Sequence, residues 1–240
     1  MSQSTKQAPA ERQSLSEQAY FVIRERILSG EIPLGAAVSR RKLAAELGMS
    51  LLPVAEALQQ LESDGLVESR PRVGTRVCQP TADEIREHYE VREALESQAA
   101  RLYSVRAEAS DRQEMMSRAD RMDEMFQQCA AGAIKDREFL YAVHNYHLDF
   151  HLKIAEYARC PALHRTIEKN HILIFNWLFD VAAKRQPLPR RFHSELIHEL
   201  NQSDPERADR CMRAHIRYGM EANVNAIAER PAPSAFERVK

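Results

Sequence analysis

The chain of 240 residues lacks several features that mark secreted, membrane-spanning and β-rich proteins. It contains only 7 glycines, which favours helices over a fold of many short strands and turns. Its 4 cysteines include no CxxC pair, and this scatter is typical of reduced thiols in a cytosolic protein. The composition therefore favours an ordinary helical protein over a disulfide-bonded scaffold.

Long apolar runs are also absent. The longest run, residues 172–179, is interrupted by Asn176 and is much shorter than the roughly 20 residues that a transmembrane helix needs. The polar N-terminal residues lack the apolar centre of a signal peptide. We expect a cytoplasmic protein with no membrane partner.

Neither sign of charge predominates. The 34 basic residues and 35 acidic residues give a formal net charge of −1, so the overall charge does not indicate a nucleic-acid partner. Any contact with DNA must therefore come from local clusters of basic side chains.

The first 80 residues predict three helices followed by a β-hairpin. Ser14 and Glu17 form a capping box at the start of the first helix, and Ser39 and Ser50 are the expected N-caps of the next two. Two short β-like runs then flank a turn at residues 71–74. Three helices and a hairpin make a winged helix-turn-helix, which we place at residues 14–79 after a disordered arm at residues 1–13.

Beyond residue 80 the pattern is helical. Thr81 with Glu84 forms a capping box at the start of one long helix, and Ser110 with Gln113 is expected to cap the next. About six helices follow one another in this part of the chain. The sequence predicts a mainly α fold, in which the winged helix-turn-helix precedes an all-α helical-bundle domain for effector binding and dimerisation at residues 80–228. A flexible tail is expected at residues 229–240.

The N-terminal part contains several short motifs. They are Pro33-Leu34-Gly35, Leu43-Ala44-Ala45-Glu46-Leu47-Gly48, Pro53-Val54, Glu56-Ala57-Leu58, Leu61-Glu62, Asp64-Gly65-Leu66-Val67 and Gly74-Thr75. Together they resemble the DNA-binding domain of GntR-family bacterial transcription regulators. The resemblance covers nearly all of residues 14–78. It implies that the chain forms a homodimer on a short inverted repeat of double-stranded DNA.

The expected recognition helix departs from this family. The family usually has arginine where the chain has Leu51, Ala55 and Gln59, and such arginines normally contact phosphate or guanine. Ser50 remains suited to a phosphate, and Leu51 or Leu52 is suited to a thymine methyl group. Arg41 matches a position where the family does place a DNA-contacting arginine.

We therefore expect the basic residues around the recognition helix to hold the DNA. The expected DNA-binding residues are Arg40, Arg41, Lys42, Ser50, Leu51, Leu52, Arg70, Arg72, Thr75 and Arg76. One of the wing arginines is suited to the minor groove. The alternative for each arginine is a solvated surface position.

The C-terminal part contains a second group of motifs. They are Tyr89-Glu90-Val91-Arg92 with Leu95-Glu96, Phe150-His151, His193, and Arg213-Ala214-His215. They resemble the all-helical effector domain of the FadR subfamily, called FCD. In metal-binding members, an aspartate or asparagine four residues before the Phe-His histidine joins three histidines around a divalent cation. The resemblance places His147, His151, His193 and His215 at these positions.

The spacing of the first pair supports a shared ion independently. His147 and His151 are four residues apart and lie on one face of a helix. Imidazole suits zinc, nickel or iron(II), and we expect zinc first. Because His147 stands where the family usually has a carboxylate, four neutral imidazoles would leave the full charge of the ion in the pocket. We expect this to favour an anionic effector. The alternative is four structural histidines without a metal.

Arg92 and Asn176 are the candidates for effector binding. Arginine offers a planar fork to a carboxylate, although an ion pair between Arg92 and Glu96 along the helix is an equally good interpretation. His144 lies three residues before His147 and is either a donor behind the metal ligands or an ordinary buried histidine. Asp149 is expected to point away from the pair.

The sequence thus predicts a DNA-binding transcription regulator, and more specifically a repressor, controlled by a small anionic carboxylate metabolite at a histidine-coordinated metal. A metal-dependent enzyme with an accessory winged helix is the main alternative. It would need an open metal position and a placed base, and no acid–base set stands out in the sequence. A module that binds a partner other than DNA is the third interpretation.

Overall fold

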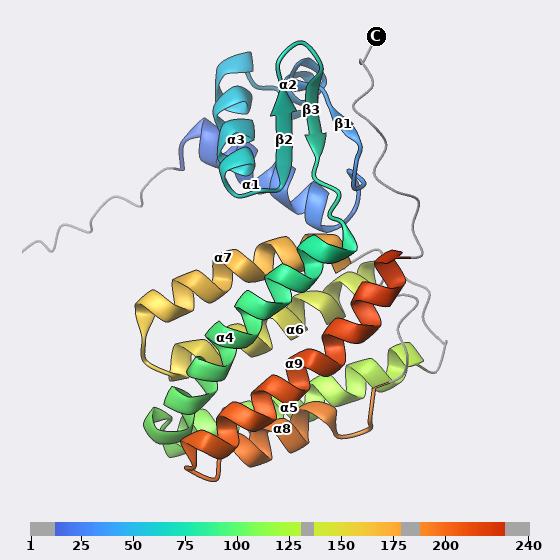
Figure 1. Cartoon of the computed structure of the whole chain (residues 1–240). Helices are drawn as coiled ribbons and strands as arrows, with labels where there is room; N and C mark the ends of the chain where they lie inside the picture. Colours follow the sequence, from blue (N-terminus) through green and yellow to red (C-terminus); the bar gives the residue numbers. More distant parts are fainter. Residues whose placement is uncertain (1–12, 131–136, 179–187, 229–240) are drawn as a thin grey trace, which may run out of the picture.

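The computed structural model describes residues 13–130, 137–178 and 188–228. Within them the chain forms a small head of helices and strands, seated on one end of a helical body (Figure 1). The predicted fold class, a winged helix-turn-helix followed by an all-helical domain, is confirmed. The predicted tail, and the predicted arm except residue 13, lie outside the described residues.

Three helices and three strands form the head. They are α1 (Leu15–Leu28), β1 (Ala37–Val38), α2 (Arg40–Leu47), α3 (Leu51–Ser63), β2 (Val67–Arg70) and β3 (Gly74–Val77). The capping box of Ser14 and Glu17 is present, and the Ser39 hydroxyl accepts the backbone N–H of Lys42. Gly48 ends α2 with φ of 63°, a left-handed conformation that favours glycine.

The sheet has one strand more than the sequence predicts. β3 pairs antiparallel with β2, from Val67 opposite Val77 to Arg70 opposite Gly74, as the hairpin requires. It also pairs with β1, which places Ala37 opposite Arg76. A strand of two residues is too short to show an alternating pattern, so nothing in the sequence predicts β1.

The body contains the remaining helices of the described residues. They are α4 (Ala82–Arg106), α5 (Ala109–Ala130), α6 (Arg137–Tyr157), α7 (Pro161–Leu178), α8 (Phe192–Leu200) and α9 (Pro205–Ala228). α4 packs along α9 and against α6 and α7, while α5 packs against α6 and α8. The capping box of Thr81 and Glu84 is confirmed. These contacts bring α6, α8 and α9 around one interior.

The predicted cap of α5 is wrong. The helix begins at Ala109, so Ser110 already lies in its first turn. The Asp111 carboxylate accepts the backbone N–H of Glu108 at 3.0 Å. A carboxylate that reaches back to the residue before the helix replaces the cap expected from Ser110 and Gln113.

Head and body each have an apolar core, and apolar side chains of the described residues connect the two units. Leu34 packs against both cores, while Tyr141 and Leu148 of α6 pack against the core of the head. The Tyr141 hydroxyl also donates a hydrogen bond to Glu25 of α1. The head is therefore held against α6 by both apolar and polar contacts.

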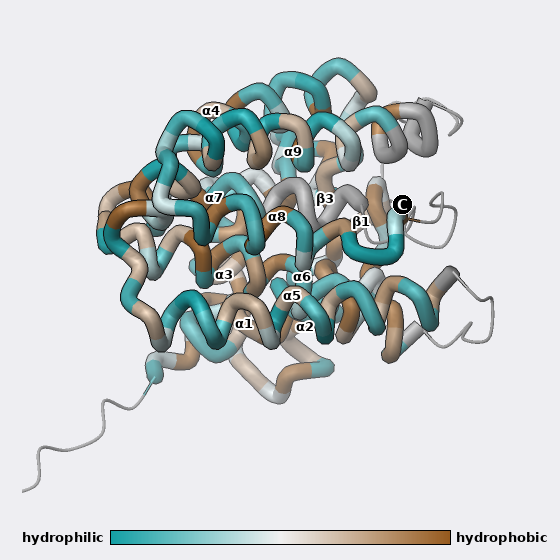
Figure 2. Tube along the Cα trace, turned by 90° about the horizontal axis from the view of Figure 1, so that it is seen from below, coloured by the Kyte–Doolittle hydropathy of each residue, from teal (hydrophilic) through white to brown (hydrophobic). Residues whose placement is uncertain are grey.

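Hydrophilic and hydrophobic residues alternate along the body helices, as Figure 2 shows. Within the described part of the chain, no helix is both long and apolar enough to cross a membrane.

Candidate metal centre and DNA-binding face

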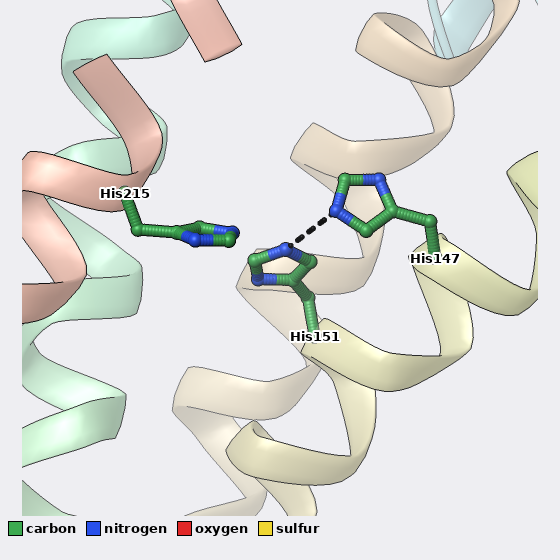
Figure 3. A group of neighbouring side chains, drawn as sticks. All are labelled: His147, His151 and His215. Atoms are coloured by element: carbon green, nitrogen blue, oxygen red, sulfur yellow. Dashed lines mark hydrogen bonds between the residues drawn. The ribbon is translucent and has the colours of Figure 1, made fainter. Parts of the chain in front are cut away.

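α6 presents two histidines on one face. His147 and His151 lie one turn apart, with their Nε2 atoms separated by 3.1 Å (Figure 3). Two nitrogens bound at about 2.0–2.1 Å to one tetrahedral ion lie roughly 3.3 Å apart. The observed separation is close to that of two ligands of one ion.

Two other helices bring further histidines to this pair. The ligand nitrogens of His147, His151 and His215 all lie within 4.8 Å of one another. Two ligands on opposite sides of one ion are separated by at most about 4.2 Å, so small ring rotations would complete a shared site. His193 lies outside this three-residue group, but its ring centroid is 5.1 Å from that of His147 and 5.3 Å from that of His215. The structure thus gathers all four predicted histidines.

Nδ1 of His151 lies beside Glu96, but two other nitrogens of this cluster are buried and have neither a hydrogen bond nor an ion-pair contact among the described residues. They are Nε2 of His193 and Nδ1 of His215. A buried polar atom without a partner costs about 1–3 kcal/mol, and most such atoms in folded proteins have one. An imidazole lone pair is a good ligand for a divalent cation, so these two atoms make the cluster a fitting metal site.

The histidines are held in the neutral form that binds metals. Burial lowers the pKa of His151 to about 4, although the nearby Glu96 raises it in part. Burial and the neighbouring imidazoles hold the pKa values of His147 and His215 well below the usual range. Burial also lowers the pKa of His193. Neutral imidazoles need not lose a proton before a metal binds.

Aromatic rings fix the orientation of the imidazoles. Phe192 stacks on His215 with ring centroids 4.3 Å apart, and Phe126 stacks on His193 at 5.3 Å. Phe150 contacts the edge of His151 at 5.5 Å. Such contacts restrict the rings to a few orientations and keep water away from them.

A buried carboxylate lies behind His151. Oε2 of Glu96 is 2.6 Å from Nδ1 of His151, while its Oε1 accepts hydrogen bonds from Arg92 and His171, each at 2.5 Å. Burial raises the pKa of Glu96, but Arg92 and the two histidines outweigh it and hold the pKa well below its usual range. A charged Glu96 orients His151 so that Nε2 faces the cluster.

A second carboxylate orients His193. Oδ1 of Asp123, on α5, lies 2.8 Å from Nδ1 of His193. The same carboxylate accepts the backbone N–H groups of His193 and Ser194 and so caps α8. Burial raises the pKa of Asp123, but these hydrogen bonds outweigh burial, so the pKa lies below its usual value. With Nδ1 engaged, Nε2 is the nitrogen of His193 that remains for a ligand.

These carboxylates correct the charge expected from the sequence. Four imidazoles alone would leave the charge of a divalent ion uncompensated. Glu96 and Asp123 are both ionised, and each contacts one of the four imidazoles from behind. The charges of a bound dication, Arg92, Glu96 and Asp123 would sum to a single positive charge at the cluster. The excess positive charge at the cluster is therefore smaller than the sequence predicts.

Arg92 forms an ion pair with Glu96, which is the alternative to a guanidinium left free for an effector carboxylate. Its Nε is 2.5 Å from Glu96 Oε1, and its guanidinium lies 5.5 Å from the centroid of the Tyr89 ring. The side chain is buried, with 7% of its surface exposed. An effector carboxylate at Arg92 would therefore share the guanidinium with Glu96.

One further buried histidine, His171, lies beside the cluster, and Asp149 has the direction expected from the sequence. His171 carries no motif, yet it is buried and bonded to Glu96 beside His151. Asp149 is directed away from the cluster and pairs with Arg118 at 2.6 Å. His144 is buried, and the side chain of Asn176 lies outside the described residues.

In the head, the first turn of α3 is apolar and exposed. Leu51 and Leu52 are 49% and 67% exposed. Ser50 is the N-cap residue, but its side chain makes no capping hydrogen bond. The hydroxyl predicted to bind a phosphate is therefore not used within the helix.

Basic side chains of the same head lie on α2, which packs against α3, and on the wing, the loop between β2 and β3. Arg40, Arg41 and Arg72 are exposed and form no ion pair with another described residue. Lys42 lies 3.7 Å from Glu46, and Arg70 lies 3.6 Å from Glu68. These are weak surface contacts that leave both side chains accessible.

A groove of about 730 Å³ separates the start of α2 from the wing. Arg40, Arg70 and Arg72 line it, together with Ser39 and Thr75. The Thr75 hydroxyl is hydrogen-bonded to that of Ser69 at 3.0 Å, and Arg76 is half-buried beside it in β3. Figure 1 shows that α2 and the wing lie at the end of the head far from the body. This face can therefore meet a large anionic partner without obstruction from the body.

The family profile of bacterial regulatory proteins of the gntR family matches residues 15–77, and that of the FCD domain matches residues 87–218. The chain belongs to the GntR family. Its function is DNA-binding regulation of transcription, since the family and its relatives are regulators. This GntR regulator is 32% identical over 202 residues to a probable D-xylose utilization operon transcriptional repressor of Paenarthrobacter nicotinovorans, covering 82% of each chain. The enzyme and the non-DNA module are thereby set aside.

Other relatives and solved structures are similar to this GntR regulator over most of its length. The repressor RspR of Escherichia coli K12 is 24% identical over 208 residues, covering 85% of this chain and 87% of RspR. The fold resembles that of E. coli McbR/YncC, with a TM-score of 0.69, 23% identity and coverage of 88% and 97%. It also resembles a regulator from Rhodococcus sp. RHA1, with a TM-score of 0.70, 20% identity and coverage of 91% and 100%.

Proposed function

We propose that this GntR regulator is a homodimeric repressor of the FadR subfamily, in which a metal ion in the helical body and a small anionic effector control binding to a short inverted repeat. The observation that carries the proposal is the convergence of His147, His151 and His215 with His193 beside them. A nitrogen of His193 and one of His215 are buried and have no partner among the described residues. A regulator that binds DNA would act in the cytoplasm. The relatives named as repressors support repression as the mode of control.

His147, His151, His193 and His215 would hold the ion. When bound, the ion supplies positive charge and a point of coordination for an anion. Four nitrogen donors favour zinc, with nickel and iron(II) as the next choices. Glu96 and Asp123 would fix two of the imidazoles and increase their basicity.

The effector would be a small carboxylate. The excess positive charge beside Arg92 favours an anion, and the guanidinium has five N–H donors, of which Glu96 takes the one on Nε. Asn176 stays a candidate for a further contact.

α6 would connect the effector site to the head. It carries His147 and His151 on one face, and Tyr141 and Leu148 against the core of the head. An effector that binds differently to two positions of α6 would therefore shift the position of the head as well. Repression would end when the two heads of the dimer no longer match the spacing of the repeat.

Purified protein is expected to carry one divalent ion per chain. Elemental analysis by mass spectrometry measures this directly, and gel retardation with and without a chelator tests its link to DNA binding. A protein that carries no metal, and that takes up none of the zinc, nickel or iron(II) added to it, would contradict the metal site while leaving the DNA-binding function intact.

Removing two arginines that form no ion pair with another described residue should weaken DNA binding at every sequence. For the double variant Arg41→Ala, Arg72→Gly we expect affinity to fall about ten-fold or more. In a dimer that loses four phosphate contacts, the slope of log affinity against log salt should become shallower by roughly 3 to 4. Glycine is used at residue 72 because Arg72 has φ of 64°, which glycine adopts without strain.

Fluorescence anisotropy over a range of salt concentrations measures both quantities. Arg121→Ala is the control, since Arg121 is an exposed arginine of α5 in the body. An unchanged salt slope in the double variant would remove these two residues from the DNA interface.

A further inference from the structure

The start of the recognition helix carries no charge that could bind phosphate or guanine. α3, Leu51–Ser63, contains no lysine or arginine, and the exposed residues of its first turn are Leu51 and Leu52. Ala55, one turn further on, is half-exposed and also apolar. Two adjacent leucines that are 49% and 67% exposed form an apolar patch that contact with solvent does not stabilise.

The surroundings of this patch identify its partner as DNA. Arg41 and Lys42 of α2, which packs against α3, and the arginines of the wing supply positive charge on the same head, and Ser50, whose hydroxyl makes no capping hydrogen bond, precedes the patch. In a helix-turn-helix, the first turn of the second helix meets base edges in the major groove. The apolar group that base pairs present in that groove is the C5 methyl of thymine.

We propose that Leu51 and Leu52 select the binding site by packing on thymine methyl groups, while α2 and the wing hold the phosphates. This inference rests on the proposed DNA-binding function and adds how the sequence is read. The leucine side chains have no donor or acceptor, so they cannot distinguish guanine or adenine by hydrogen bonds. Removal of one buried methyl should weaken binding about four-fold.

Uracil lacks only this methyl group, so it isolates the contact. Full-length protein is used to select binding sites from two pools of random-sequence duplex DNA, one made with thymine and the other with uracil. The site selected from the thymine pool is then synthesised with single thymine-to-uracil replacements in each half-site, and affinities are measured by fluorescence anisotropy.

The double variant Leu51→Ala, Leu52→Ala is measured on the same duplexes. Both side chains are exposed, so the fold should be unaffected, and a thermal melt checks this. Val105→Ala is the matched control, because Val105 is an apolar residue of the body that is 56% exposed.

The expected result is a site rich in thymine, about four-fold weaker binding at one or two uracil positions of each half-site, and loss of this penalty in the leucine variant alone. Equal affinity for the thymine and uracil sites would overturn the inference, and so would a penalty that persists in the leucine variant. In both cases a selected sequence would still support the proposed function. If neither pool yields a preferred sequence, the proposed operator binding fails, and the reading of thymine fails with it.

Discussion

Replacing Glu96 by alanine should lower the free energy of unfolding by about 3–5 kcal/mol. The change leaves the guanidinium of Arg92 buried without a counter-charge, and it removes the acceptor of His171 and the neighbour of His151. A buried charge that loses its partner keeps its full desolvation penalty, which is why the expected effect exceeds that of an ordinary surface pair. Urea denaturation in the presence of a chelator measures the change without a contribution from metal.

Glu156→Ala is the control for this prediction. Glu156 pairs with Lys153 at 2.7 Å, but half of its side chain is exposed, so the loss should be within about 1 kcal/mol. A second variant, Glu96→Ala with Arg92→Met, removes both charges and should recover part of the stability. If Glu96→Ala has no larger effect than Glu156→Ala, the carboxylate is not the counter-charge on which the interior depends.

Zinc should stabilise the protein strongly, and the loss of two histidines should abolish this effect. A ligand at about 1,000 times its dissociation constant adds roughly 4 kcal/mol to the free energy of unfolding when it binds only the folded state. His151→Ala with His215→Ala removes ligands from two helices, so the remaining histidines cannot enclose the ion. Thermal unfolding with and without added zinc should show a large upward shift for the wild type and none for the variant.

His198→Ala separates the metal site from a general effect of histidine loss. His198 lies on α8, like His193, but it is exposed. This variant should retain the full response to zinc. A response that survives in the double variant would show that zinc binds elsewhere on the chain.

Local signals predicted most of the fold. The capping boxes at Ser14 and Thr81 and the N-cap at Ser39 were all readable from a few adjacent residues, and the structure confirms them. The errors arise where the structure depends on a contact that the local sequence pattern does not specify. Asp111 replaces Ser110 at the start of α5, and β1 exists only because β3 is beside it.

The candidate site divides in the same way. The four histidines were predictable because two are spaced by one helical turn and the family motifs carry the others. Asp123 was not predictable, because it is 70 residues from His193 in the sequence and reaches it only through the packing of α5 against α8. His171 was missed for the same reason, since its bond to Glu96 joins α7 to α4.

Leu34 has a consequence for how the protein folds. This side chain packs against the apolar cores of both head and body, and α6 adds Tyr141 and Leu148 to the contact. A head excised at residue 79 would expose the surface that these α6 side chains cover. The two units should therefore melt together in a single cooperative transition, and the winged helix cut from the chain should be less stable than it is in the whole protein.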